Sequence, residues 1–368
     1  MWRRNSPLVS VVVPVHDVEP YVVACLSSLL AQTHRRLEVI VVDDGSTDRS
    51  AELAEQVAAG DDRVRVVRTP NRGLGAARNE GVRHVTGDLL AFADSDDLVP
   101  TDAYSTMVGR ILQTRADLVT GNIARLEDDE LVPVPWMSRL HPAERTLTID
   151  DCPDLLGDVF AWNKLFGRDF WEQQDLSWPE GVRYEDQPTS TEAFLAARKI
   201  AVTPEVVYHW RIRSDGSSIT QQRASVTDLA DRWATKQLTL ESVRRRASEP
   251  LELALLERIL PADMWRYFVL IPEADDAWWD LLVAGVRELW GEHSLTHSVL
   301  PPVHRLTGWL VEQDRRADAV TVIGHLRGLA GARVARAPDG RGGTRLEIPG
   351  LDPESISAEA LAVRPSEA

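Results

Sequence analysis

Three carboxylates stand close together at residues 94–97, in the order Asp-Ser-Asp-Asp. They follow the apolar run 89–93, which predicts a strand, so acid is expected at the end of that strand. Carboxylates this close repel one another, and a divalent cation relieves the repulsion while leaving coordination positions for substrate phosphates. The other interpretation is an acidic turn in which Asp97 or Thr101 caps the next helix.

A second acidic pair, Glu185 and Asp186, lies in the segment Arg-Tyr-Glu-Asp-Gln at 183–187. Transfer of a group to a hydroxyl requires a base that removes the hydroxyl proton, and one carboxylate suffices. The alternative is a pair of acidic residues at the solvated start of a helix. The pair is therefore a candidate for proton transfer.

Strands and helices must alternate to position these acids. Apolar runs without alternation predict strands buried on both faces, and helical spacing predicts the intervening helices. Strands are expected at 9–15, 37–42, 64–67 and 89–94, and helices at 19–32, from Ser46 or Thr47 to about 59, and at 76–85. This order predicts a parallel α/β sheet with ligands at the carboxyl ends of its strands.

Two glycines, Gly73 and Gly75, precede the helix expected at 76–85. A dinucleotide-binding fingerprint would have a third glycine where Arg78 stands, and it would follow the first strand instead of the third. We therefore expect a tight turn at the start of a helix whose amino end, with Arg78, faces phosphate.

The formal net charge of −16, from 41 basic and 57 acidic residues, argues against a general nucleic-acid-binding protein.

Two cysteines, Cys25 and Cys152, are too few for a disulfide framework and are expected to be thiols in a cytoplasmic protein. Residues 7–15 are too short for a signal peptide, and no run approaches the roughly 18 apolar residues of a membrane span. Membrane contact, at the inner face, would be peripheral.

Four segments in this order resemble glycosyltransferase family 2, the inverting nucleotide-sugar enzymes with the GT-A fold. They are 13–19 (Val-Pro-Val-His-Asp-Val-Glu), 41–48 (Val-Val-Asp-Asp-Gly-Ser-Thr-Asp), 71–79 (Asn-Arg-Gly-Leu-Gly-Ala-Ala-Arg-Asn) and 92–97 (Phe-Ala-Asp-Ser-Asp-Asp). The resemblance extends through 162–166, 184–186 and 208–211, and so covers the chain to about residue 220.

The resemblance implies a nucleotide pocket. Pro14, His16 and Asp44 would line the uracil and ribose site, with Asn71 and Arg78 beside it. The family often has tyrosine where His16 stands, and an imidazole still allows stacking.

The resemblance also implies the chemistry of transfer. Asp94-Ser95-Asp96 is the DxD motif, with Asp94 near the ribose and Asp96 on Mn²⁺ or Mg²⁺. In the resembling enzymes the second acid of the Glu185–Asp186 pair is the base, so Asp186 is the expected base and Glu185 orients the acceptor.

Aromatic, arginine and hydroxyl side chains are mixed at 208–219, which we expect to be a loop that closes over the donor and excludes water. A surface cation–π cluster is the alternative. The expected diphosphate contacts are Arg211 and Ser217 or Ser218. Trp162 and Lys164 are expected to form a wall for the acceptor or the donor, although a core position would also explain Trp162.

The domain organisation changes at about residue 223. A GT-A domain at 1–222 is followed by helical spacing at 223–330, which predicts a helical appendage. Residues 331–368 predict two short strands and a polar tail, the start of a β-rich module in a fragment of a longer protein. These parts resemble the amino-terminal glycosyltransferase module of Gram-positive wall-polymer enzymes, including teichoic-acid glycosyltransferases.

Two further groups in the appendage carry weaker hypotheses. His293, His297 and His304 lack an evident acidic or thiol ligand that would favour zinc. The basic run 244–246 is expected to be a solvated helix face, with contact to an anionic polymer or lipid headgroup as the alternative.

We therefore expect a metal-dependent inverting transferase that moves a sugar from a UDP donor to a hydroxyl of a surface glycan, a polyol-phosphate polymer or a precursor of either. A nucleotidyltransferase would need a basic glycine-rich loop on the first strand, which is absent. A catalytically weak glycan- or nucleotide-sugar-binding module is a second alternative, and a polymerising synthase would share all these residues. The oligomeric state, a homo-oligomer included, is left open.

Overall fold

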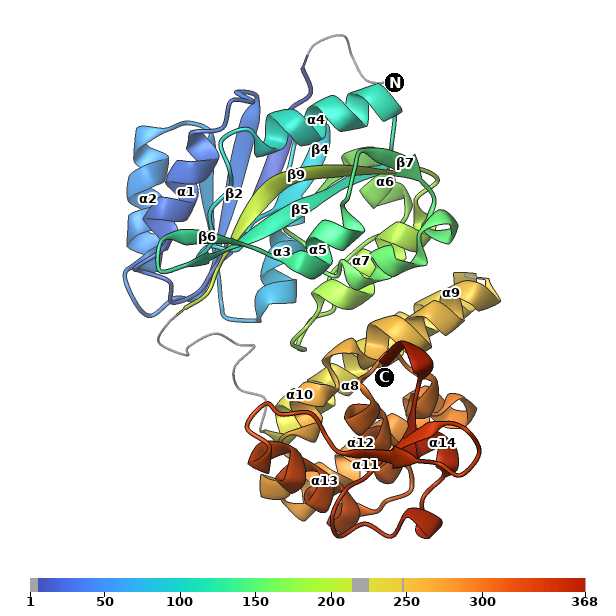
Figure 1. Ribbon diagram of the computed structural model, residues 1–368. Helices are drawn as coiled ribbons and strands as arrows, with labels where there is room; N and C mark the ends of the chain where they lie inside the picture. Colours follow the sequence, from blue (N-terminus) through green and yellow to red (C-terminus); the bar gives the residue numbers. More distant parts are fainter. Residues whose placement is uncertain (1–5, 214–224, 247, 368) are drawn as a thin grey trace. The chain divides into compact units, whose positions relative to one another are not determined.

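The computed structural model of the 368-residue chain describes residues 6–213, 225–246 and 248–367. The chain forms two compact units, the first made of residues 1–218 with 245–247 and the second of residues 219–244 with 248–368. The first unit is an α/β domain, and the second is mainly helical (Figure 1).

A nine-stranded mixed sheet is the centre of the first unit. The strand order is β3-β2-β1-β4-β8-β5-β9-β7, and β6 pairs with β5. Strands β1 to β4 are parallel, β8 is antiparallel to both β4 and β5, and β9 is parallel to β5. The strands are β1 (Val9–Val15), β2 (Leu37–Asp44), β3 (Val64–Thr69), β4 (Leu89–Phe92), β5 (Leu118–Glu127), β6 (Glu130–Pro133), β7 (Arg145–Leu147), β8 (Lys164–Gly167) and β9 (Ile200–Arg211).

The predicted strands are present in the first half of this unit, and their parallel pairing is confirmed. The prediction of a loop from residue 208 is wrong for residues 208–211, which lie on β9. Two neighbours hold this polar segment extended, because β9 pairs with β5 and His209 forms a bridge with Leu98. Tertiary pairing therefore overrides the loop-like composition.

Helices cover both faces of the sheet (Figure 1). Alternate residues of β1 and β2 pack in the large core with α1 and α4, whereas Ile40 and Val42 face Ala77 of α3. The continuous apolar runs follow from this burial on both sides. The helices are α1 (Val22–Leu30), α2 (Ser50–Gly60), α3 (Leu74–Val82), α4 (Ala103–Thr114), α5 (Pro135–Leu140), α6 (Arg168–Gln173) and α7 (Asp186–Ala196).

The predicted helix caps are wrong. Helix α2 begins at Ser50, after Arg49, because Thr47 and Asp48 donate their backbone N–H groups to the carboxylate of Asp17 at 2.7 and 3.3 Å. Helix α4 likewise begins after Asp102, and not after Asp97 or Thr101. The acidic turn at 94–97 is therefore free of a capping role.

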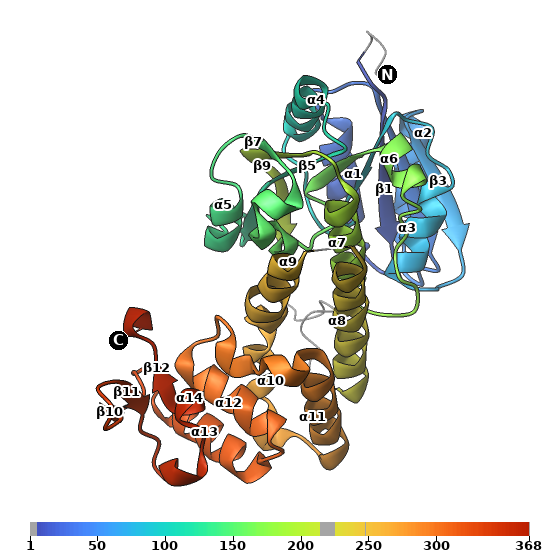
Figure 2. The ribbon, with the colours of Figure 1, turned by 90° about the vertical axis from the view of Figure 1, so that its right-hand side faces the viewer.

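The second unit contains a group of helices and a small antiparallel sheet, β10-β11-β12 (Figure 2). The predicted helical pattern is confirmed, and the predicted boundary at residue 331 falls inside this unit. Arg305 of α12 donates to the carbonyl oxygen of Ala362 at 3.2 Å and pairs with Glu367. The elements are α8 (Val226–Arg246), α9 (Glu249–Ala254), α10 (Trp265–Phe268), α11 (Asp276–Trp290), α12 (Pro302–Glu312), α13 (Arg316–Gly328), β10 (Arg336–Pro338), β11 (Thr344–Leu346), α14 (Ala358–Leu361) and β12 (Ala362–Val363).

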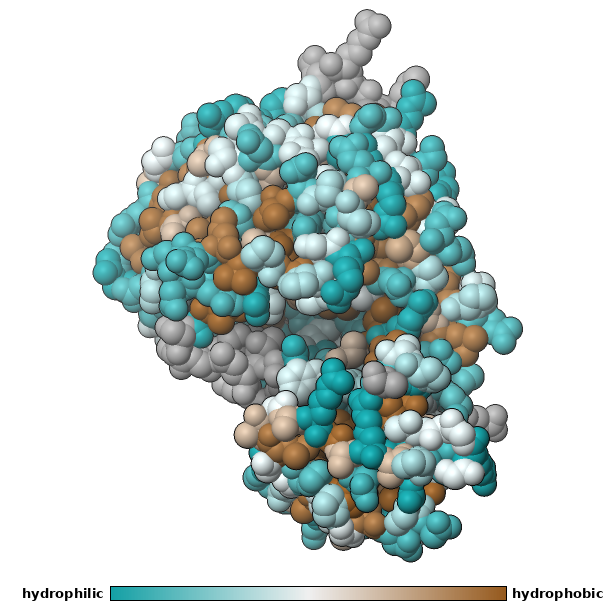
Figure 3. Space-filling view, viewed as in Figure 1, coloured by the Kyte–Doolittle hydropathy of each residue, from teal (hydrophilic) through white to brown (hydrophobic). Residues whose placement is uncertain are grey.

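Hydrophilic residues cover much of the surface in the view of Figure 3, and apolar residues form separate small groups. Among the described residues, no helix has the length and apolar character needed to cross a bilayer. The same residues contain no group of three or more His, Cys, Asp or Glu side chains arranged to hold a metal, so the histidines of the second unit form no zinc site there.

Candidate active site

The carboxyl ends of β1, β2 and β3 bring together the residues predicted to bind a nucleotide. Nδ1 of His16 lies 3.0 Å from the carbonyl oxygen of Asp44, and Nε2 of the same imidazole lies 3.1 Å from Nδ2 of Asn71. The imidazole is exposed, whereas Pro14 is buried within β1. An aromatic face and an amide therefore lie at one edge of the sheet, where they can stack on and hydrogen-bond a base.

The carboxylate of Asp44 shapes the loop before α3. It accepts hydrogen bonds from the backbone N–H groups of Arg72 and Gly73 at 2.9 and 2.8 Å. A Cβ atom on Gly75 would lie 2.1 Å from the carbonyl oxygen of Pro179, so close packing requires that glycine. The predicted phosphate contact at this helix start is thus replaced by a contact with a carboxylate of the protein.

Arg78 lies at the centre of the acidic residues. Its guanidinium contacts Asp94 at 2.8 Å, Glu185 at 2.7 Å and Asp186. Its side chain is 0% exposed and lies 5.0 Å from the ring centre of Trp178. The prediction that Arg78 contacts the donor is therefore wrong. It instead positions the acids, because buried carboxylates require a paired cation.

Burial and charge perturb these acids. Burial is the main cause that raises the pKa of Glu185 to about 8; the charge of Asp186 adds to the shift and Arg78 opposes it. Burial also raises the pKa of Asp186, whose carboxylate accepts a hydrogen bond from the backbone N–H of Ala161. The predicted helix start at this pair is confirmed, but Glu185 is buried there, and the side chain of Asp186 is 19% exposed. A carboxylate with a raised pKa is a stronger base near neutral pH.

Glu185 gives a prediction about stability and pH. A carboxyl group whose pKa is raised on folding contributes stability below its unfolded pKa, here 4.5, and loses that contribution as pH rises to the folded value of about 8. We expect Glu185→Gln, which cannot ionise, to flatten the decline of the first unit's thermal midpoint over that interval. Calorimetry of the full chain between pH 5 and 8 measures it. Exposed Glu205→Gln is the control, and an unchanged slope in Glu185→Gln would contradict the prediction.

Residues of β9 hold the DxD turn in place. The hydroxyl oxygen of Tyr208 accepts a hydrogen bond from the backbone N–H of Asp94 at 2.9 Å. The backbone N–H of Arg211 donates to Oδ1 of Asp97 at 2.6 Å, and its Nε donates to the carbonyl oxygen of Asp96 at 2.8 Å. The structure thus places Arg211 at the turn, and its contact with a diphosphate stays a prediction; Ser217 and Ser218 lie outside the described residues.

The described residues of the turn form no complete metal site, because no group of three or more ligating side chains is arranged there. Oδ2 of Asp96 lies 2.8 Å from Nε and from Nη2 of Arg213, and burial raises the pKa of Asp96. Asp94 supplies a second carboxylate, and Ser95 between them is 5% exposed. A cation here would compete with Arg213 for Asp96 and would need further oxygen ligands from outside the described residues, as a diphosphate supplies.

Trp162 does not form a wall. Its ring stacks on Phe160 at 4.4 Å and on Tyr208 at 4.1 Å, with interplanar angles of 16° and 18°. Two rings cannot both stack this closely on one face, so they cover opposite faces. Trp162 is 4% exposed, and the core interpretation of this residue is the one that holds.

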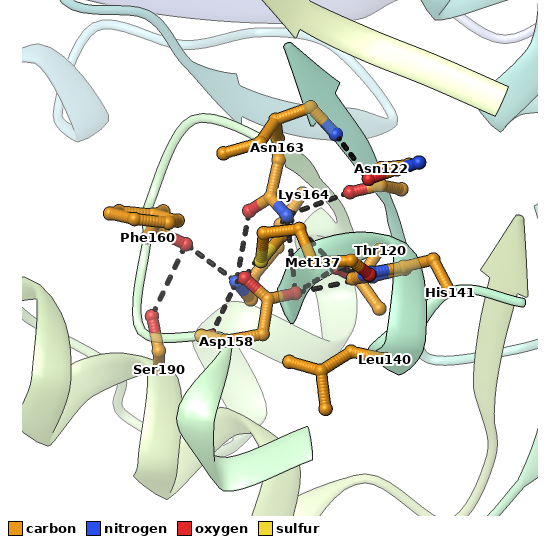
Figure 4. A network of polar contacts seen from close by, with 12 residues as sticks. Thr120, Asn122, Met137, Leu140, His141, Asp158, Phe160, Asn163, Lys164 and Ser190 are labelled. Atoms are coloured by element: carbon orange, nitrogen blue, oxygen red, sulfur yellow. Dashed lines mark hydrogen bonds and ion pairs between the residues drawn. The ribbon is translucent and has the colours of Figure 1, made fainter. Parts of the chain in front are cut away.

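Lys164 is also absent from any wall, because its side chain is 0% exposed. Figure 4 shows Lys164 in a network of polar contacts with Asp158 and Asn163. Its ammonium lies 2.9 Å from the carboxylate of Asp158 and donates to the carbonyl oxygens of Asp158 and Phe160 at 2.8 and 2.6 Å. His141 and Asn163 approach the same carboxylate at 3.4 and 3.0 Å. The network fixes the segment 158–163, which carries the N–H that binds Asp186.

Comparison with known proteins gives the family of this chain. The family model "Glycosyl transferase family 2" matches residues 10–172. The glycosyltransferase GlyG of Streptococcus pneumoniae is 30% identical over 219 residues, which make up 57% of this chain and 72% of GlyG. The chain belongs to glycosyltransferase family 2.

Other relatives are matched over a smaller share of their own length. EpsJ of Bacillus subtilis, an uncharacterised glycosyltransferase, is 33% identical over 213 residues, or 56% of this chain and 61% of EpsJ. The poly(ribitol-phosphate) β-glucosyltransferase of Bacillus spizizenii is 28% identical over 217 residues, or 58% of this chain and 33% of that enzyme. The chain thus spans about three fifths of EpsJ and a third of the second relative.

The family 2 fold is also found in solved structures. Residues 1–349 of Staphylococcus aureus TarS, in complex with UDP-GlcNAc, superpose with a TM-score of 0.75 at 19% identity, covering 94% of this chain and 98% of that one. A likeness at this identity shows the fold. The predicted GT-A domain with a helical region after it is confirmed.

Three contributors to this family 2 site were missed in the sequence. Tyr208 and Arg213 contact the DxD turn from β9 and from just beyond it, and Asp158 anchors Lys164. Arg213 lies two residues after Arg211, so the alternation of a strand would have placed both near the same acids. No sequence pattern indicates the role of Asp158, because it is a single acidic residue in a segment without regular secondary structure.

Proposed function

We propose that this chain is an inverting glycosyltransferase that moves a sugar from a UDP-sugar to a hydroxyl of a cell-surface polymer or its precursor, with Mn²⁺ or Mg²⁺. The observation that carries the proposal is the position of Arg78, which contacts Asp94 of the DxD turn and also Glu185 and Asp186. TarS was crystallised with UDP-GlcNAc, which supports the donor. The poly(ribitol-phosphate) β-glucosyltransferase supports a polymer acceptor.

The donor would bind across two groups of residues. The uracil stacks on His16 and hydrogen-bonds Asn71 at the edge of β1 to β3, and the diphosphate reaches the turn beside Arg211. Asp94 and Asp96 would hold the divalent cation, which when bound supplies positive charge to the departing diphosphate. The guanidinium of Arg211 adds charge-assisted hydrogen bonds to the same oxygens.

The acceptor hydroxyl attacks the anomeric carbon from the side opposite the diphosphate. A new C–O bond forms as the bond from the anomeric carbon to the phosphate oxygen breaks, so the configuration inverts and UDP leaves with the electron pair. Asp186 accepts the hydroxyl proton, held in place by Arg78 and by the N–H of Ala161. Burial raises the pKa of Glu185, so its carboxyl group favours the neutral form, which limits repulsion beside the base, and Glu185 orients the acceptor.

Calorimetric titration of UDP, with Mn²⁺ and then with EDTA, tests the donor site. Hydrolysis of a panel of UDP-sugars then tests turnover without an acceptor. Binding and Mn²⁺-dependent hydrolysis support the proposal. UDP binding without hydrolysis or transfer would instead identify a nucleotide-sugar-binding module, and absence of UDP binding in both conditions would exclude the donor site.

Asp96→Ala tests the cation ligand. We expect the affinity for UDP in Mn²⁺ to fall by at least about tenfold, because a carboxylate that coordinates the cation is lost. In EDTA the parent and the variant should bind UDP equally. Exposed Asp62→Ala is the matched control. Equal affinity of parent and Asp96→Ala in Mn²⁺ would remove Asp96 from the cation site.

A further inference from the structure

An aromatic cluster lies beside the candidate base. Its members are Trp136, Phe160, Trp162, Tyr208 and Trp210, whose rings contact one another at centroid distances between 4.1 and 6.4 Å. Trp162 and Tyr208 are buried beneath the others. Trp136 is 36% exposed, and Phe160 and Trp210 are half-buried. The cluster thus has a buried base and three outer rings that reach the surface.

The cluster is joined to the transfer site on both sides. Phe160 and Trp162 flank Ala161, whose backbone N–H donates to the carboxylate of Asp186. On the other side, the hydroxyl oxygen of Tyr208 accepts a hydrogen bond from the backbone N–H of Asp94 at 2.9 Å. A ligand on the outer rings would therefore lie next to the base.

The sheet order separates this cluster from the nucleotide edge. His16 directly follows β1, Asp44 is the last residue of β2 and Asn71 lies just after β3, and these strands are all on one side of β4. Trp210 is on β9, Trp136 is on α5 after β6, and Phe160 precedes β8, all on the other side of β4. The acidic turn after β4 lies between them. A molecule on the aromatic cluster therefore approaches the turn from the side opposite the nucleotide, as an acceptor must.

The chemistry of the surface indicates what it binds. The faces of aromatic rings are electron-rich and stack on the C–H face of a sugar ring. Burial of apolar area and weak C–H contacts stabilise this stacking. The three outer side chains, Trp136, Phe160 and Trp210, carry no charge, so the surface they form offers a phosphate no cation to pair with.

We propose that the outer face of the aromatic cluster is the acceptor subsite and that it takes the pyranose ring of a glycan. This inference rests on the proposed function and specifies its acceptor. The hydroxyl that is glycosylated then belongs to a neutral sugar ring stacked on Trp136, Phe160 and Trp210, and not to a polyol phosphate.

Transfer of the sugar to small acceptors tests whether the acceptor is a pyranose ring. The donor that the UDP-sugar panel identifies is incubated with methyl pyranosides of glucose, galactose, rhamnose and N-acetylglucosamine, and separately with ribitol 5-phosphate and glycerol 3-phosphate. Product on a pyranoside and none on the polyol phosphates is expected by mass spectrometry. Product on the polyol phosphates alone, or no product while UDP-sugar hydrolysis proceeds, overturns the inference. Loss of UDP binding and hydrolysis in the parent protein would instead be a failure of the proposed function.

Trp136 variants test the cluster itself. We expect Trp136→Ala to raise KM for the pyranoside at least about tenfold, as for loss of an aromatic anchor. Trp136→Phe keeps an aromatic face and should restore KM to within about threefold of the parent value. Trp265→Ala, at a tryptophan that is 41% exposed in the second unit, is the matched control with unchanged KM. An unchanged KM in Trp136→Ala would remove the cluster from acceptor binding.

Discussion

Asp186→Asn is expected to lower kcat for sugar transfer by at least about 100-fold, the usual scale for loss of a general base. Asparagine keeps the shape and an acceptor oxygen for the N–H of Ala161, but it cannot take a proton at neutral pH. The nucleotide edge lies at β1 to β3, so the Kd for UDP should stay within about twofold of the parent value. Transfer kinetics and calorimetry measure the two quantities separately.

The same variant distinguishes a base from a structural acid. If Asp186 served only to pair with Arg78, a neutral side chain would disturb Asp94 as well and would weaken UDP binding together with turnover. Asp62→Asn, at an exposed position, controls for the loss of one charge. Turnover of Asp186→Asn near the parent value would remove Asp186 from the mechanism.

Lys164→Met is expected to destabilise the first unit by about 3–5 kcal/mol, because removing one partner of a buried ion pair leaves the other charged and without a counterion. Asp158 and Lys164 are both 0% exposed. The charge of Lys164 is the main cause that keeps the pKa of Asp158 below its ordinary value despite burial. Urea unfolding of the full chain, followed by hydrogen exchange in peptides of β5 and β8, measures the loss.

Two comparisons make this result specific. Lys199→Met removes an exposed lysine of the same unit and should leave stability unchanged to within about 0.5 kcal/mol. Asp158→Asn combined with Lys164→Met removes both charges and should recover part of the loss. A Lys164→Met protein as stable as the parent would show that the network does not hold the segment 158–163.

The strand ends were predictable because their signals are local. An apolar run with acid at its end or shortly after it marks the ends of β1, β2 and β4, and parallel pairing then gathers those ends at one edge. His16, Asp44 and Asn71 meet for this reason. The four family segments added the order of the motifs, which individual patterns do not supply.

The sequence pattern did not reveal which site residues are buried. Arg78 was assigned to the nucleotide because it follows a glycine-rich turn, but its partners Glu185 and Asp186 are 107 and 108 residues away in the sequence. Lys164 and Trp162 look like surface residues in a short motif, and their neighbours Asp158 and Tyr208 decide otherwise. Each of these errors comes from a long-range contact that overrides a local interpretation.

The order of the strands has a consequence for how such proteins diversify. Strands β1 to β4 come from the continuous stretch 9–92, and the strands on the far side of β4 come from 118–211. The part of the chain before α4 thus carries the residues proposed to bind the nucleotide, and the part after α4 carries the aromatic rings. If both proposals hold, we expect that exchanging the second part between relatives changes the acceptor while the donor stays the same.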